Sequence, residues 1–170
     1  MDNATLSRVN LKGVFKALEL LVELDEKAAN LIANTDEIIQ FTSPKATIRL
    51  AVKHGKITHH LGAGPNTMNL AFPTPAMVNK MFDGSGSPIP LKGFRKIKFL
   101  TGPFTELTDL LSKYLQPAPG ALDDPEFKRI NTLLTMCVVA HAAAEIANSD
   151  EYGMAIAGRM RDGDLQLAVK

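Results

Sequence analysis

The alternation of apolar and polar residues between positions 46 and 61 constrains the fold of this chain most strongly. In residues 47–53 the apolar positions are Ile48, Leu50 and Val52. This two-residue period is typical of a strand with one buried face. The sequence therefore predicts a sheet that is covered on one side only.

Two further segments extend this pattern. His54 and Gly55 form a turn signal into residues 56–61, and residues 67–72 repeat the alternation after a glycine-rich loop. Adjacent alternating runs separated by turn residues favour antiparallel pairing. We therefore expect three strands connected as a meander.

A short helix is expected over residues 76–82. Thr74 is a suitable N-cap, and Pro75 stands at the first helical position, where a missing N–H costs nothing. Its apolar face combines flexible thioether side chains with an aromatic ring. The residues of this face are Met77, Val78, Met81 and Phe82.

The next segments predict a further strand at residues 97–100 and an amphipathic helix at residues 103–115. Helices are also expected over residues 5–34, with a possible break at Gly13, and from residue 123 onwards. These helices supply the apolar surface that covers the predicted sheet.

Together, residues 37–115 resemble the sterol-carrier-protein type of lipid-transfer domain. The resemblance rests on a strand pair with a glycine turn at 52–57, a strand at 68–72, a helix that closes on Phe-Asp-Gly at 82–84, and the Gly-x-x-Lys-Ile-Lys segment 93–98. It implies an α+β fold with a sheet of about five strands, mainly antiparallel, covered by helices around an apolar tunnel. It also implies binding of fatty acyl chains, acyl-CoA or sterols without catalysis.

The apolar residues of these segments have two interpretations. The ordinary one is a packed core. The other is a partly hollow interior, because flexible methionines on a short helix tolerate a ligand better than branched side chains do. On the second interpretation the tunnel residues are Leu50, Met68, Leu70, Phe72, Met77, Met81, Phe82, Leu107 and Leu111.

Four basic residues precede or occupy the predicted strand at 97–100, namely Lys92, Arg95, Lys96 and Lys98. They form either a solvated strand face or a binding site for an anionic head group. In the second case the apolar part of the ligand enters the tunnel. Both interpretations stay open at this stage.

Composition argues against several classes of protein. The 170 residues are 45% hydrophobic and 22% charged, with a net charge of +1, which argues against a nucleic-acid-binding protein. The first residues lack a basic and apolar leader, and we expect no stable membrane insertion. With a single cysteine, the chain fits a reducing compartment, and we expect a cytoplasmic protein.

An internal repeat suggests how the C-terminal part is organised. Residues 32–37 return as 146–151 with one conservative change, and residues 50–53 return as 167–170. The repeat predicts a helix followed by a hairpin whose first strand spans residues 153–160.

The expected organisation is a lipid-binding domain at 1–116, a linker at 117–122 and a partial second repeat at 123–170. Half of a packed unit cannot bury its own apolar face. The C-terminal hairpin therefore either joins another sheet, in this chain or in a second subunit, or belongs to a longer tandem. Self-association is expected in both cases.

Signals for a metal site or for catalysis are weak. Cys137, His141 and Glu145 stand four residues apart on one helix face and could hold a metal ion. Apolar neighbours favour a core-facing helix instead, and we expect neither a metal nor a cofactor. His59 and His60 point to opposite faces of a strand, and the chain has no Gly-x-Ser-x-Gly motif.

The sequence thus predicts non-catalytic binding and carriage of a long-chain apolar ligand. The alternative is a structural or dimerisation module of a larger protein, with no ligand of its own.

Overall fold

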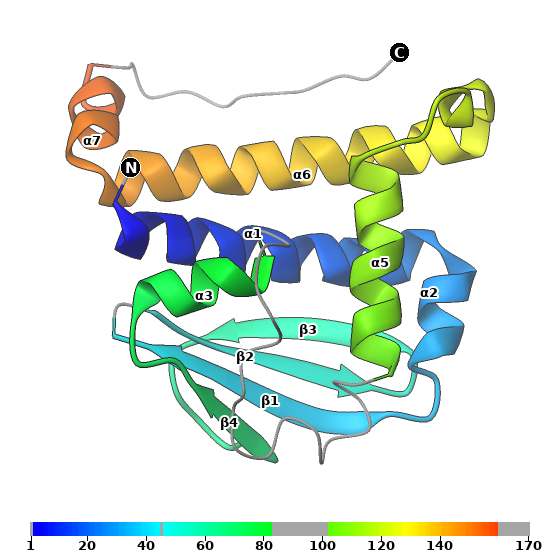
Figure 1. Ribbon diagram of the computed structural model, residues 1–170, viewed down its shortest axis with the longest axis horizontal. Helices are drawn as coiled ribbons and strands as arrows, with labels where there is room; N and C mark the ends of the chain where they lie inside the picture. The colour runs from blue at the N-terminus through cyan, green and yellow to red at the C-terminus, as the bar shows by residue number, and fades with distance from the viewer. Residues whose placement is uncertain (1, 45, 83–101, 160–170) are drawn as a thin grey trace.

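The computed structural model describes residues 2–44, 46–82 and 102–159. In chain order the elements are α1 (Asn3–Leu24), α2 (Glu26–Leu31), β1 (Asp36–Ser43), β2 (Ala46–Lys53), β3 (Lys56–Leu61), β4 (Met68–Ala71), α3 (Pro75–Phe82), α5 (Pro103–Leu115), η2 (Ala121–Asp123), α6 (Pro125–Ser149) and α7 (Glu151–Ala157). They form an α+β fold in layers: the sheet lies on one side, α1 with its neighbouring helices lies in the middle, and α6 lies outermost (Figure 1).

The sheet of the described residues has four strands in the order β3-β2-β1-β4. β1 pairs with β2 and β2 with β3 in antiparallel fashion, as the alternation predicts, whereas β4 runs parallel to β1. The predicted meander is therefore wrong at its third strand, and the sheet is mixed. The expected fifth strand, at residues 97–100, lies outside the described residues.

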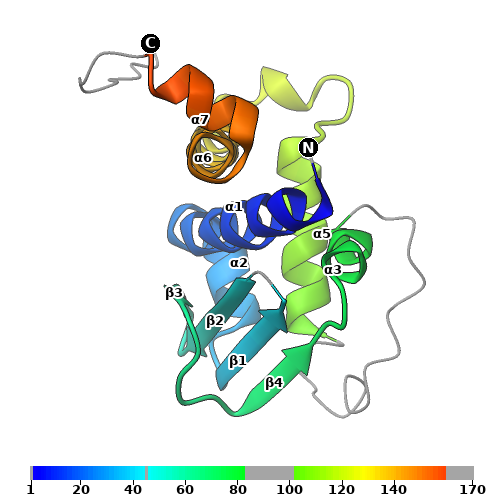
Figure 2. The ribbon, with the colours of Figure 1, turned by 90° about the vertical axis from the view of Figure 1, so that its left-hand side faces the viewer.

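The loop between β3 and β4 explains the error. It crosses beneath the sheet, on the face opposite α1, to reach the other edge (Figure 2). Gly64 donates its N–H to Gln40 Oε1 at 3.1 Å and lies directly against the guanidinium of Arg49, which a side chain at Gly64 would have to displace. The glycine-rich loop is thus a close crossover and not a hairpin turn, because contacts with distant strands fix its path.

The sheet buries one face, as the alternation predicts. Ile48, Leu50 and Val52 of β2 are all buried, and in the strand register Leu50 stands opposite Ile39 and Ile48 opposite Phe41. These residues form one apolar cluster with the helices above them. The cluster is the core of the fold.

Helix α1 is buried on opposite sides. Asp2 caps its start by accepting a hydrogen bond from Thr5 N at 2.7 Å. Phe15 and Ala17, two residues apart and therefore about 200° apart around the helix, are both fully buried. Such burial requires packing partners on both sides, and α1 lies between the sheet and α6 (Figure 2).

The predicted helix over residues 5–34 is interrupted at Asp25 and not at Gly13. Asp25 ends α1 and caps α2 by accepting a hydrogen bond from Lys27 N at 2.8 Å. Its other carboxylate oxygen accepts a hydrogen bond from Tyr114 Oη of α5 at 2.9 Å. Burial and this bond raise the pKa of Tyr114 to about 12, so the phenol keeps its proton and remains a donor.

The structure confirms the two predicted covering helices. α3 spans Pro75–Phe82 and α5 spans Pro103–Leu115. Phe104, Leu107 and Leu111 of α5 are buried in the core cluster. The predicted linker, residues 117–122, falls between α5 and α6, and α6 then packs along α1 with Ile130 and Leu134 in the same cluster.

The predicted strand at residues 153–160 is wrong, because α7 (Glu151–Ala157) is a helix there. Asp150 accepts a hydrogen bond from Gly153 N at 3.1 Å, and Gly153 lies so close to the carbonyl of Ile146 that no side chain fits. The same repeated hexapeptide leads into β1 in its first copy, where the residues that follow pair with β2. Neighbouring structure, and not the hexapeptide, decides the outcome. The second strand of the predicted hairpin lies outside the described residues.

Replacement of Phe15 by Ala tests the central position of α1. Phe15 is fully buried and its ring centroid lies 4.7 Å from that of Phe41. The free energy of unfolding should fall by about 3–5 kcal/mol, as measured by urea denaturation. Leu61→Ala, at an exposed position in β3, is the control and should change it by no more than about 0.5 kcal/mol. Equal effects of the two substitutions on the free energy of unfolding would contradict the central position of α1.

Candidate functional site

The nine predicted tunnel residues come together between the sheet and the helices. Five of them are buried: Leu50, Leu70, Phe72, Leu107 and Leu111. The other four, Met68, Met77, Met81 and Phe82, are partly buried and pack against the same apolar cluster. Residues from four parts of the chain thus belong to one apolar core cluster, as the packed-core interpretation also predicts. We refer to the part that contains these nine residues as the apolar site, and its least buried members belong to α3 and β4.

A polar contact that the sequence analysis missed positions α3. Asn79 is buried, and its Nδ2 donates to the carbonyl of Asn3 at 3.2 Å, while its Oδ1 accepts from Asn10 Nδ2 at 3.1 Å. These bonds join the middle of α3 to α1. An asparagine between the apolar residues of a short helix is the signal that could have indicated this role.

Three phenylalanines that the prediction omitted lie within the apolar site. The ring centroid of Phe15 lies 4.7 Å from that of Phe41 and 6.5 Å from that of Phe82. The ring centroids of Phe41 and Phe104 are 6.4 Å apart. Edge and tilted contacts of this kind are favourable aromatic geometries. The rings connect the sheet to α1, α3 and α5, and they fill part of the interior.

The predicted head-group residues, Lys92, Arg95, Lys96 and Lys98, lie outside the described residues. Their relation to the apolar site stays a prediction.

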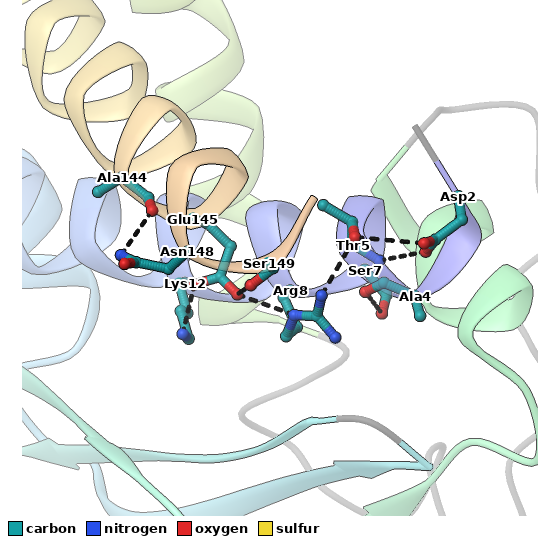
Figure 3. A network of polar contacts seen from close by, with 10 residues as sticks. All are labelled: Asp2, Ala4, Thr5, Ser7, Arg8, Lys12, Ala144, Glu145, Asn148 and Ser149. Atoms are coloured by element: carbon teal, nitrogen blue, oxygen red, sulfur yellow. Dashed lines mark hydrogen bonds and ion pairs between the residues drawn. The ribbon is translucent and has the colours of Figure 1, made fainter. Parts of the chain in front are cut away.

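The proposed metal set on α6 is divided between two environments. Glu145 accepts hydrogen bonds from Arg8 Nε and Ser149 Oγ, both at 2.8 Å, and pairs with Lys12 (Figure 3). Burial opposes its ionisation, but the hydrogen bonds from Lys12, Ser149 and Arg8 outweigh burial and lower the pKa of Glu145. The Glu145 carboxylate thus joins α6 to α1 through these contacts.

Cys137 and His141 lie near a second polar cluster. His59 Nδ1 of β3 lies 2.6 Å from Glu19 Oε2 of α1, and Lys16 Nζ lies 3.0 Å from Glu19 Oε1. Burial raises the pKa of the Cys137 thiol, so the thiol keeps its proton near pH 7. Within residues 2–44, 46–82 and 102–159, no group of three His, Cys, Asp or Glu side chains is arranged to hold a metal ion.

The same charges act on His141. Burial, followed by the positive charges of His59 and Lys16, lowers the pKa of His141, and the opposing charge of Glu19 does not cancel this effect. The imidazole therefore stays neutral near pH 7 while α6 is packed in place.

Comparison with protein-family models, curated proteins and solved structures finds no match for this chain. The functional argument therefore depends on the residues of the chain itself.

Stability should depend on the protonation of His141. The unfolded chain binds a proton more readily than the folded one, so the free energy of unfolding should fall as pH decreases from 7 through about 6.5 towards the lowered pKa. His141→Gln should flatten this part of the profile measured by urea denaturation. His60→Gln, at an exposed position in β3, is the matched control and should leave the pH dependence of the free energy of unfolding that His141 causes unchanged. An unchanged profile in His141→Gln would refute the prediction.

Proposed function

We propose that this chain binds and carries a long-chain apolar ligand, such as a fatty acid, an acyl-CoA or a sterol-like lipid, between its sheet and helices α1, α3 and α5. It does so without catalysis. The observation that supports this proposal most is that Met68, Met77, Met81 and Phe82 pack on a buried apolar cluster while remaining partly exposed. The ligand would reach the cluster by displacing these side chains.

The energetic argument favours an opening at α3. Full burial of a large apolar side chain is worth about 1.5–3 kcal/mol, so the displacement of a side chain that is already partly in water costs less. Each methylene that the ligand buries returns roughly 0.8 kcal/mol. A hydrocarbon chain of several methylenes therefore offsets the displacement of two methionines.

The attachment of α3 suits such a movement. Val78 is buried and Asn79 is hydrogen-bonded to α1, so the middle of α3 is fixed in place. Met77 precedes and Met81 follows this fixed segment in the sequence. Thioether side chains change rotamer readily and adapt to irregular shapes. Side-chain movement can thus admit a ligand without the release of α3 from α1.

The alternative is an assembly module with no ligand, and the contacts among Phe15, Phe41 and Phe82 favour it, because these rings fill part of the interior. Native mass spectrometry of freshly purified protein separates the two functions. Retained fatty acid supports carriage, whereas an empty protein in repeated preparations supports assembly.

Met81→Trp should block the proposed site. The bulkier indole would occupy the volume that the ligand is proposed to take, and we expect affinity for oleate to fall at least about tenfold, a loss of about 1.4 kcal/mol. The chain has no tryptophan, so the new side chain also reports its own environment by fluorescence. Leu61→Trp, at an exposed position, is the control and should bind oleate normally. Equal oleate affinity in both variants would exclude this site.

Lys96→Gln combined with Lys98→Gln tests the head-group prediction. Removal of two positive charges should reduce the preference for anionic over neutral lipid, measured by competition between oleate and its methyl ester. Lys56→Gln, which removes an exposed charge from β3, is the control. Unchanged selectivity in the double variant would show that these lysines do not bind the head group. This result would not bear on the apolar site.

A further inference from the structure

The outer side of α6 is apolar, and the described residues leave it largely uncovered. The helix packs on α1, and its buried residues are Ile130, Leu134 and Glu145, of which Glu145 pairs with Arg8. Residues 131–144 contain no Asp, Glu, Lys or Arg, and Val139 is 61% exposed. In length and composition α6 would suffice to cross a membrane, yet only 17% of its most apolar stretch is buried. A helix of this composition normally has a partner on more than one side.

Exposed apolar side chains continue beyond both ends of α6. Among the described residues, five large hydrophobic side chains are exposed, and four of them belong to this part of the chain: Leu122, Val139, Met154 and Ile156. Leu122 stands seventeen residues before Val139, and Ile156 stands seventeen residues after it. The turn containing η2 and helix α7 rise from opposite ends of α6, on the side away from α1 (Figure 1).

We propose that this surface is the interface between two copies of the chain, with their α6 helices antiparallel about a two-fold axis near Val139. In such an isologous pair, every contact occurs twice, and a position before the axis in one copy meets a position equally far after it in the other. Leu122 of one copy then lies at the same end of the interface as Met154 and Ile156 of the other. Exposed apolar residues thus stand at both ends of the interface, on the turn before α6 and on α7.

Charges flanking the apolar region are complementary in the same arrangement. Lys128 and Glu151 are both exposed and stand eleven residues before and twelve residues after Val139. Lys128 lies about 16 Å along α6 from the axis at 1.5 Å per residue. On the other side of the axis α6 ends at Ser149, about 15 Å away, and Glu151 begins α7 just beyond that end. Lys128 of one copy therefore faces Glu151 of the other at both ends of the interface.

A second copy fits this surface better than a lipid bilayer does. The two ends of the apolar region differ in charge: Lys128 stands near the start of α6, where Arg129 pairs with Glu126, and Glu151 stands at the start of α7. An anionic bilayer surface attracts the basic end but repels the carboxylate of Glu151, whereas a second copy in antiparallel orientation pairs the two ends. The net charge of +1 gives two copies little mutual repulsion.

Sedimentation velocity of the full chain over a range of concentrations tests the interface. We expect a monomer–dimer equilibrium that Val139→Glu shifts to monomer, because two carboxylates would meet near the axis. Circular dichroism should show an unchanged fold for this exposed substitution. A full chain that remains monomeric at the highest concentration would overturn the proposal.

A charge exchange makes the test specific. Lys128→Glu alone and Glu151→Lys alone should each weaken self-association at least about fivefold, since each homodimer gains two repulsive pairs. An equimolar mixture of the two variants should associate again as a heterodimer, because each end then joins a glutamate to a lysine. Lys56→Glu, at an exposed position in β3, is the control and should associate like the unmodified chain.

Failure of the mixture to associate better than either variant alone would contradict this arrangement. Flotation with phosphatidylcholine–phosphatidylglycerol vesicles provides the other outcome. Vesicle binding by monomers that Val139→Glu abolishes, with no effect of mixing, would assign the surface to a bilayer and overturn the proposal. Both results are independent of oleate binding, so they do not bear on the carriage proposal.

Discussion

The burial of α1 on opposite sides is the constraint on which the rest of the structure depends. Phe15 reaches Phe41 of the sheet, and Ala17, about 200° away around the helix, is buried as well. One helix thus serves two layers: it covers the apolar site above the sheet and supports α6 on its other side. The proposed ligand site and the proposed interface can therefore lie on opposite sides of α1 in a chain of 170 residues.

Polar contacts fix how the other helices lie on α1. Asn79 joins α3 to the first half of α1, and Glu145 joins the end of α6 to Arg8 and Lys12. Hydrogen bonds are directional whereas apolar contacts are not, so these groups specify position more than they add stability. Among the described residues, the methionines of α3 and Val139 on the outer side of α6 make no such contact, and these are the two surfaces to which we propose to assign binding.

Local periodicity was enough to predict the strands around residues 46–61 and the helix at 103–115, because each buries one face with a regular spacing. It failed where distant contacts decide the path of the chain. The loop at Gly64 crosses the sheet because of Gln40 and Arg49, and the repeated hexapeptide leads into a strand once and a helix once. The place of the nine apolar residues in the core could be predicted from type and spacing, and they do belong to one cluster, while their role in ligand binding stays a prediction. The role of Asn79 could not, since its partners lie about seventy residues away.

The seven methionines provide the most direct measurement of where a ligand binds. Methyl-labelled methionine NMR during an oleate titration reports on both sides of α1 at once. Our account predicts saturable shifts for Met68, Met77 and Met81, which pack on the apolar cluster, and none for Met136 and Met154 of α6 and α7. Shifts confined to Met136 and Met154, or no response at Met68, Met77 and Met81 at saturating oleate, would contradict it.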